Sequence, residues 1–245
     1  AYIWERGTAQ AVPVLDAQPL AALRGIDAQT EALRANFARL AAGAAAHDVL
    51  LWGARGMGKS ALVRATVADV QANVQANAPE ALALVQIAPG SLPSVPALIA
   101  ALAAQSRAFV LFIDDLGFSA DGRTEMLALR SLLDGGSAPR PAHIRLAVTT
   151  NRRAIVARED TSTALHERDE RDDALALADR FGLTLAFHPA DQDTYLAILA
   201  GYTAPLGLTF DPAEAMAFAI QRGNRSGRTA LQFATELAGR AGIRL

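Results

Sequence analysis

The sequence predicts an α/β protein in which a five-stranded parallel sheet is flanked by helices and followed by a small all-helical unit. Three observations predict this fold class. Short apolar runs alternate with helical patterns, which is typical of a parallel sheet covered by helices. A glycine-rich segment joins the first run to a helix, and from Asp191 onward no strand pattern remains. With 245 residues, 51% of them hydrophobic, the chain is long enough to bury a full core.

The predicted strands are short runs rich in Val, Ile, Leu and Phe, as expected for strands that are buried on both faces of a sheet. In chain order they are residues 48–52, 81–87, 109–113, 144–150 and 183–187. Helical patterns lie between them, at residues 59–70, 95–104 and 123–134. We expect the last of these helices to bury its leucines, which are Leu127, Leu129, Leu132 and Leu133.

The C-terminal part of the chain contains helical patterns alone. Three helices are predicted, at residues 192–204, 212–221 and 227–241, which is enough for a small bundle. The boundary with the sheet-forming part is expected around Pro189, because proline interrupts regular structure.

A phosphate-binding loop is predicted in LLWGARGMGKSALV, residues 50–63. Gly53, Gly58, Lys59 and Ser60 have the G-x-x-x-x-G-K-[ST] spacing of a P-loop, or Walker A motif. A glycine-rich turn that fits by chance is the alternative. The predicted strand before the motif and the predicted helix after it argue against chance, because the motif requires that context.

Each residue type in this loop suits phosphate binding. Glycines at positions 53, 56 and 58 let backbone N–H groups approach phosphate oxygens, and the helix that starts near Lys59 adds its positive N-terminal end. Lys59 is expected to reach the β- and γ-phosphates, and the Ser60 hydroxyl to ligate Mg²⁺. The expected nucleotide-binding residues of the loop are Gly53, Ala54, Arg55, Gly56, Met57, Gly58, Lys59, Ser60 and Ala61.

Two adjacent carboxylates, Asp114 and Asp115, follow the third predicted strand. Taken alone, the pair fits the cap of the next helix or turn equally well. Together with the phosphate-binding loop, the pair indicates a Walker B position, because P-loop enzymes hold Mg²⁺ with the loop Ser or Thr and an Asp that ends a second strand. We assign this metal-binding role to Asp114. Asp115 is then expected to orient or activate the attacking water.

Composition narrows the class of protein. The net charge is −2 and the pI about 6.1, so no overall positive charge favours nucleic acid, although a local basic patch is compatible with these values. The chain has no cysteine, which excludes disulfides and thiolate metal sites and is compatible with the cytoplasm. No apolar run reaches the length of a membrane span. Residues 157–180 are crowded with charge, which we interpret as a solvated loop in preference to a binding surface.

Beyond these motifs, the chain resembles the AAA+ ATPases from about residue 25 to residue 242. The resemblance is carried by LLWGARGMGKSALV, FIDDLG, TTNRR, DRFGL, FHPADQDTYLAI and NRSGRTALQF. Within that superfamily it looks most like an uncharacterised bacterial group defined as a domain of unknown function, and IDDLG is also similar to helicase loaders and transposition helper ATPases. The resemblance implies an ATP- and Mg²⁺-dependent ATPase, with an N-terminal extension (1–24), an α/β core (25–190) and a helical lid (191–245).

The resemblance also implies roles for three residues outside the two motifs. Asn151 falls at the sensor 1 position, where an amide contacts the γ-phosphate or the attacking water, and helix capping is its alternative role. Arg180 matches the arginine finger, which reaches the nucleotide of a neighbouring subunit, and an ion pair with Asp179 or the acidic stretch is the alternative. Arg228 resembles sensor 2, with Arg225 as the competing candidate.

Base binding and assembly are implied in the same way. Gly25 and Ile26 lie where the family places its adenine-side segment, and are expected to flank the base. Nucleotide is usually bound at a subunit interface in this superfamily, so a nucleotide-dependent homo-oligomer, either a ring or an open assembly, is expected. One departure concerns Asp115, because most AAA+ enzymes have Glu at this position. The shorter side chain predicts slow hydrolysis, and a switch more than a motor.

Two functions remain open at this stage. The first is a cytoplasmic ATPase that remodels an unknown protein client. The second is a nucleotide-gated adaptor associated with DNA, like the helicase loaders, with residues 151–153 and 222–228 as basic contacts. The acidic pI and the lack of aromatic residues among these basic ones favour the first.

Overall fold

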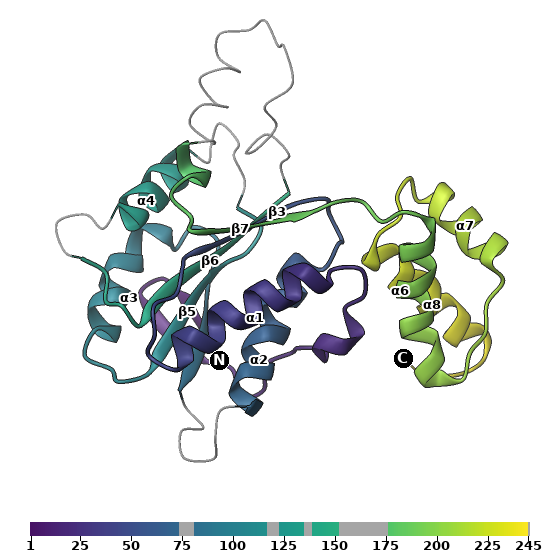
Figure 1. The fold of residues 1–245 in the computed structure, drawn as a ribbon, viewed down its shortest axis with the longest axis horizontal. Helices are drawn as coiled ribbons and strands as arrows, with labels where there is room; N and C mark the ends of the chain where they lie inside the picture. The colour runs from purple at the N-terminus through teal and green to yellow at the C-terminus, as the bar shows by residue number, and fades with distance from the viewer. Residues whose placement is uncertain (74–80, 117–122, 135–138, 152–175, 245) are drawn as a thin grey trace, which may run out of the picture.

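Seven strands form one sheet in the computed structural model of this chain, and helices cover both faces of the sheet (Figure 1). The structure describes residues 1–73, 81–116, 123–134, 139–151 and 176–244. Arg152, Arg153 and most of the charged stretch therefore lie outside the described residues. The order of strands across the sheet is β2-β1-β4-β5-β6-β3-β7.

Five neighbouring strands of this sheet correspond to the five predicted apolar runs. They all run parallel to one another, from β4 at one side to β7 at the other edge. Their bounds are Val49–Gly53 for β3, Leu82–Ile87 for β4, Ala108–Ile113 for β5, Ile144–Thr150 for β6 and Leu183–Phe187 for β7. The predicted α/β fold class is confirmed, and the carboxyl ends of β3, β5 and β6 meet at the same edge of the sheet.

Two further strands extend the sheet beyond the five that were predicted. Strand β1 (Tyr2–Glu5) pairs parallel with β4, and β2 (Thr8–Ala11) pairs antiparallel with β1. The turn between them has positive φ at Arg6 (49°) and Gly7 (83°), as a type I′ hairpin turn requires. Sequence reasoning missed this hairpin because both strands are four residues long and every residue of β2 is exposed, which leaves no apolar pattern.

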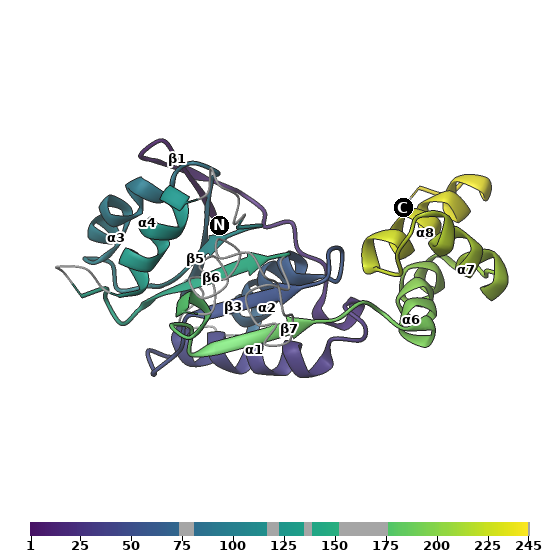
Figure 2. The same ribbon diagram turned by 90° about the horizontal axis from the view of Figure 1, so that it is seen from above.

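The helices lie in two layers on the sheet (Figure 2). Helices α1 (Asp27–Ala41) and α2 (Lys59–Asn73) cover one face, and α3 (Val95–Leu102) and α4 (Arg123–Leu133) cover the other. In β3, Leu51 packs toward α1 and α2 while Leu50 packs toward the opposite face, as the alternation of a strand requires. No helix among the described residues is long and apolar enough to cross a membrane.

One detail of α4 differs from the expectation. Leu129 and Leu132 are buried, whereas Leu127 is 59% exposed. Positions 129 and 132 are three residues apart and therefore share a helix face, but position 127 is turned about 200° from position 129. The four leucines of this helix do not all fit one face.

The three C-terminal helices form a bundle beside the sheet, joined to β7 by an extended segment (Figure 1). They are α6 (Gln192–Thr203), α7 (Pro212–Gln221) and α8 (Gly227–Arg240). Each begins with a side-chain cap: Asp191, Asp211 and Ser226 accept backbone N–H bonds in their own helices. Tyr195 is fully buried between the helices, and the rings of Phe218 and Phe233 lie 5.0 Å apart.

A buried ion pair joins β3 and β6 at the amino end of the sheet. The Asp48 carboxylate, just before β3, pairs with Arg140 and accepts the backbone N–H of Leu146 at 2.8 Å. Both charged side chains are 12% exposed. Arg145 lies nearby, and its pKa is lowered by burial while the charge of Asp48 opposes that shift. One carboxylate thus offsets the charge of two arginines.

We predict that Asp48→Ala lowers the free energy of unfolding by about 3 kcal/mol, because it leaves two arginines in a buried place without their carboxylate. Urea denaturation measures the change. Asp69→Ala is the matched control, since Asp69 pairs with Arg34 at the surface and its loss should change stability far less. Equal effects of the two substitutions would contradict the structural role of Asp48.

Candidate functional site

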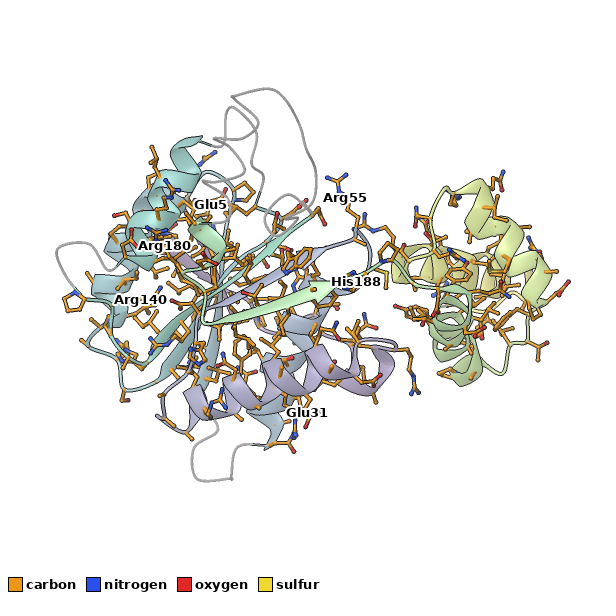
Figure 3. All side chains as sticks on the ribbon, turned by 45° about the horizontal axis from the view of Figure 1, so that its top comes forward. Glu5, Glu31, Arg55, Arg140, Arg180 and His188 are labelled. Atoms are coloured by element: carbon orange, nitrogen blue, oxygen red, sulfur yellow. The ribbon has the colours of Figure 1, made fainter. Side chains whose placement is uncertain are left out.

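A cavity of about 560 Å³ lies where the carboxyl edge of the sheet faces the helical bundle. The loop between β3 and α2 forms one wall, and the ends of β5 and β6 form another. Residues from the segment before α1, from α6 and from α8 complete the lining. Figure 3 shows Arg55 and His188 at this side of the sheet, with Arg140 and Arg180 on the side away from the bundle. The cavity therefore lies between the sheet and the helical bundle.

The loop between β3 and α2 depends on glycine at two close approaches. Gly53 has a φ of 122°, and a Cβ atom there would lie 2.1 Å from the Phe187 carbonyl oxygen of β7. Gly56 has a φ of 74°, and a Cβ atom there would lie 2.8 Å from Ser226 Oγ. Larger residues at these positions would push the loop away from β7 or from the bundle. The glycines thus place the loop between strand and bundle.

Lys59 is the buried cation of the cavity. Its Nζ donates to the carbonyl oxygens of Gly53 (2.9 Å) and Ala54 (2.8 Å) and to Asn151 Oδ1 (3.0 Å), and its exposed fraction is 6%. Burial lowers its pKa to about 8, although the charges of Asp115 and Asp114 oppose this shift. All three acceptors are neutral, so an anion entering the cavity would be a better partner for the ammonium group.

Asp114 is surrounded by donors at the end of β5. Its Oδ1 accepts from Ser60 Oγ at 2.5 Å and from Thr149 Oγ1 at 2.7 Å, while its Oδ2 lies 3.2 Å from an Arg64 guanidinium nitrogen. Thr149 and Arg64 were not predicted from the sequence. Thr149 lies two residues before the predicted site residue Asn151, so the sequence could have indicated it, whereas the position of Arg64 depends on the way α2 packs against β5.

The pair of Ser60 and Asp114 fits a magnesium ion by its chemistry. A hydroxyl and a carboxylate oxygen, already within hydrogen-bonding distance, are the oxygen ligands that Mg²⁺ takes together with phosphates and water. Among the described residues, no group of three or more His, Cys, Asp or Glu side chains is placed to hold a metal. A metal held by these two residues would take its further ligands from phosphate oxygens and water.

Asp115 has an unusual backbone. Its φ is 54°, its N–H donates to Thr149 Oγ1 at 2.8 Å, and its carboxylate accepts from the Asn151 amide. Asn151 therefore bridges Lys59 and Asp115, with its oxygen toward the cation and its nitrogen toward the carboxylate. Aspartate tolerates the left-handed region better than most residues, which gives a conformational reason for Asp at this position.

The helical bundle contacts the loop through the first turn of α8. The Arg228 N–H donates to the Gly56 carbonyl oxygen at 3.2 Å, and Ser226, which caps α8, lies against Gly56. Arg228 lines the cavity. Arg225, the competing candidate, is not among the lining residues; its charge instead lowers the pKa of Asp191, after the larger effect of the Asp191 hydrogen bonds to Thr194.

The segment before α1 lines the cavity with more residues than were predicted. Ile26 faces the cavity, whereas Gly25 packs against Thr194 of α6 and lies outside the lining. Sequence reasoning missed the side chains of Gln18 and Leu23, which also line it. No local motif marks them, because their place depends on the path of the chain past the loop. Gly53 and Ala54 likewise do not line the cavity, and contribute through their bonds to Lys59.

Arg180 is not brought to the cavity of its own chain. Its Nε donates to Asp134 Oδ1 at 2.5 Å, at the end of α4, and a second guanidinium nitrogen donates to the Ala176 carbonyl oxygen at 2.5 Å. The side chain is partly exposed, and Figure 3 shows it away from the bundle. Its ion-pair partner is therefore Asp134 rather than Asp179. Within one chain, Arg180 does not reach the cavity.

Comparisons with solved structures identify the fold. The RuvB Holliday junction branch migration motor of Thermotoga maritima is 17% identical with a TM-score of 0.54, over 94% of this chain and 68% of that chain. The Orc1 protein of Aeropyrum pernix, solved in complex with DNA, is 16% identical with a TM-score of 0.63, over 89% of this chain and 61% of that chain. At these identities the likeness shows the fold alone, which is that of the AAA+ P-loop ATPases.

No curated protein matches the chain. The model of a family described as "Protein of unknown function (DUF815)" matches residues 1–241, almost the whole sequence. The resemblance predicted from the sequence is thus confirmed, both for the AAA+ fold and for an uncharacterised group within it. The chain belongs to the DUF815 family.

Proposed function

We propose that this protein binds ATP with Mg²⁺ in the cavity and hydrolyses it slowly, and that the cycle drives a conformational change acting on a protein client. One observation carries the proposal. Lys59, a buried lysine with a lowered pKa, lies where the glycine-rich loop meets the first turn of α2. Its ammonium group donates to neutral oxygens and lines the cavity. An anionic phosphate is the ligand that such a group binds best.

The remaining polar groups suit the other needs of the reaction. Ser60 and Asp114 would hold Mg²⁺, which when bound supplies positive charge to the β- and γ-phosphates. Asp115 and Asn151 form a hydrogen-bonded pair beside Lys59, and in the proposal they orient the attacking water. Arg228 faces the same cavity, so in the proposal it contacts the terminal phosphate as the bundle closes.

The conformational part of the proposal rests on the contact between loop and bundle. Gly56 of the loop touches both Ser226 and Arg228 of the bundle through backbone and short side-chain contacts. Phosphate binding that shifts the loop by a fraction of an ångström would therefore also displace the first turn of α8. In the proposal, residues 25–190 bind the nucleotide, residues 191–245 act as the lid, and residues 1–24 form an extension whose hairpin joins the sheet.

Assembly is the second part of the proposal. Arg180 lies outside the cavity of its own chain and is partly exposed, as an arginine that completes the site of a neighbour must be. We propose a homo-oligomer in which this residue reaches the neighbouring nucleotide after leaving Asp134. For the alternative of a DNA-associated adaptor, Arg222 and Arg225 are exposed on the bundle, Arg228 lines the cavity, and Arg152 and Arg153 lie outside the described residues.

We predict that ATP binding at pH 8 is accompanied by the uptake of about half a proton, because Lys59 has a pKa of about 8 when free and the phosphates favour its charged form. Protons are taken up and not released, because the pKa of Lys59 is lowered in the protein without nucleotide, so that about half of the ammonium groups are neutral at pH 8 and become protonated in the complex. Calorimetric titrations in two buffers with different ionisation enthalpies measure the uptake.

Two variants control that measurement. Lys59→Arg should bind ATP without proton uptake, since a guanidinium is already charged at pH 8. Lys59→Ala should lose nearly all affinity, because it removes the cation aimed at the phosphates. Unchanged affinity in Lys59→Ala would contradict the binding site itself.

We predict that Asp115→Asn keeps Mg²⁺-dependent ATP binding but lowers turnover by about 10²-fold or more, the scale of general base catalysis. Asp114→Asn should instead weaken the part of ATP affinity that depends on Mg²⁺, because it removes a charged ligand. Binding with and without Mg²⁺, together with phosphate release, separates the two effects. Asparagine also tolerates the positive φ of position 115. Equal loss of binding in both variants would show that the two roles are wrongly divided.

We predict that Arg180→Ala binds ATP normally but hydrolyses it up to about 10³-fold more slowly, as expected for an arginine finger acting between chains. Hydrolysis by the wild type should rise with protein concentration. Mixing Arg180→Ala with Lys59→Ala should restore part of the activity, since one chain supplies the loop and the other the arginine.

Asp134→Ala is the matched control for this prediction. It breaks the same ion pair from the other side, so it should leave hydrolysis unchanged or raise it by freeing Arg180. If both variants lose activity equally and mixing rescues neither, Arg180 has a structural role within one chain.

A further inference from the structure

One hydroxyl group lies between the two carboxylate residues of the cavity. Thr149 belongs to β6, is 1% exposed and lines the cavity. Its Oγ1 lies 2.7 Å from Asp114 Oδ1 and 2.8 Å from the backbone nitrogen of Asp115. In the proposed function, Asp114 holds the metal and Asp115 orients the attacking water. A single side chain on the neighbouring strand therefore contacts both residues.

The directions of the two bonds follow from the chemistry of the groups. A backbone N–H can only donate, so the Thr149 hydroxyl oxygen accepts the bond from Asp115. A hydroxyl has one proton and an ionised carboxylate can only accept, so this proton is donated to Asp114. The orientation of the hydroxyl is thus fixed by its two partners.

Thr149 also holds the turn that follows β5. The Leu116 N–H donates to the Thr149 carbonyl oxygen at 2.8 Å, next to the bond from the Asp115 N–H to the hydroxyl. Asp115 has a φ of 54°, and a residue other than glycine keeps such a conformation only where its surroundings impose it. Without the hydroxyl, the Asp115 backbone would be held only by the neighbouring Leu116 bond and by the contact of its side chain with Asn151.

The bond to Asp114 has a second consequence when a metal is bound. Asp114 Oδ1 accepts from both Ser60 and Thr149 in this structure. If Ser60 Oγ ligates Mg²⁺, a lone pair of that oxygen faces the metal and its proton turns away from the carboxylate. Thr149 then remains as the hydroxyl donor to Oδ1, while Arg64 lies beside Oδ2. Loss of a partner that orients a ligating carboxylate typically costs about 10- to 100-fold in metal affinity or activity.

We propose that Thr149 is a positioning residue that fixes the two carboxylates relative to each other. Its hydroxyl orients Asp114 Oδ1 toward the metal. It also holds the backbone of Asp115 in the conformation that directs its side chain toward the attacking water. The inference rests on the proposed ATP hydrolysis and deepens it by naming the group that couples metal binding to the positioning of the water.

The test compares Thr149→Val, which removes the hydroxyl and keeps the shape of the side chain, with Thr149→Ser, which keeps the hydroxyl. For the full chain of each variant, calorimetry gives the dissociation constant of ATP in EDTA and at saturating Mg²⁺, and phosphate release gives the turnover at saturating ATP. Thr149→Val should bind ATP in EDTA as the wild type does, because the bonds of Lys59 within the loop are untouched. The gain in ATP affinity from Mg²⁺ should fall about tenfold. Turnover should fall about 10²-fold, since a small displacement of a group that positions a reactant has an effect of this size.

Thr149→Ser should stay within about threefold of the wild type in all three measurements, because a serine hydroxyl can make both bonds. Thr66→Val is the matched control. Thr66 lies in α2 and is buried, as Thr149 is, but its Oγ1 has no hydrogen-bond partner among the described residues. This variant should leave ATP binding and turnover unchanged.

Three outcomes overturn the inference and leave the proposed function intact. The first is wild-type behaviour of Thr149→Val, or a loss confined to the Mg²⁺ gain or to turnover, because the hydroxyl would then not couple the two. The second is a loss of ATP affinity in EDTA as large as the loss at saturating Mg²⁺. The third is equal impairment of Thr149→Ser and Thr149→Val, which would show a role in packing. A wild type that does not bind ATP, or whose ATP affinity gains nothing from Mg²⁺, overturns the proposed function, and the inference with it.

Discussion

The buried ammonium group of Lys59 is the constraint around which the site is arranged. A cation at this depth is tolerated because three oxygen acceptors surround it, two from the loop and one from Asn151 at the end of β6. Those acceptors meet only because β3 and β6 are parallel neighbours that end at one edge of the sheet. Asp114 and Asp115 reach the same edge on β5, and their charges partly offset the loss of hydration. The order of the strands in the sheet therefore determines which acceptors and charges surround Lys59.

Much of this arrangement is predictable from local sequence. Each of the five apolar runs predicts a strand that the structure contains. The spacing of Gly53, Gly58 and Lys59 predicts the loop between β3 and α2, because such a loop depends on the backbone geometry of residues that are close in the sequence. The bonds of Thr149 and Arg64 to Asp114 were not predictable, since each joins residues that are far apart in the sequence and meet only through packing. Helix α1 and the N-terminal hairpin were also missed, the hairpin because its strands carry no apolar alternation.

Asp115 shows how local and long-range effects combine. From sequence, its short side chain suggests a loss of reach toward water, and hence slow hydrolysis. In the structure its φ of 54° adds a second constraint, because a longer side chain without a local hydrogen bond is less favourable in that region. The bonds from Thr149 and Asn151 hold the residue in this conformation. The length of the side chain and the backbone conformation thus both constrain position 115. A glutamate there would reach further toward the attacking water, but its backbone conformation would be less favourable than that of aspartate.

The hairpin of β1 and β2 has a consequence for solubility. Without it, β4 would be the edge of the sheet, and residues Leu82–Ile87 form an almost entirely apolar strand with a row of free backbone groups. Such an edge invites pairing with another chain and aggregation. The hairpin replaces it with β2, a strand of four exposed residues, which is too short and too polar to template much pairing. The N-terminal residues thus shield the sheet from intermolecular β-pairing, whatever else they do.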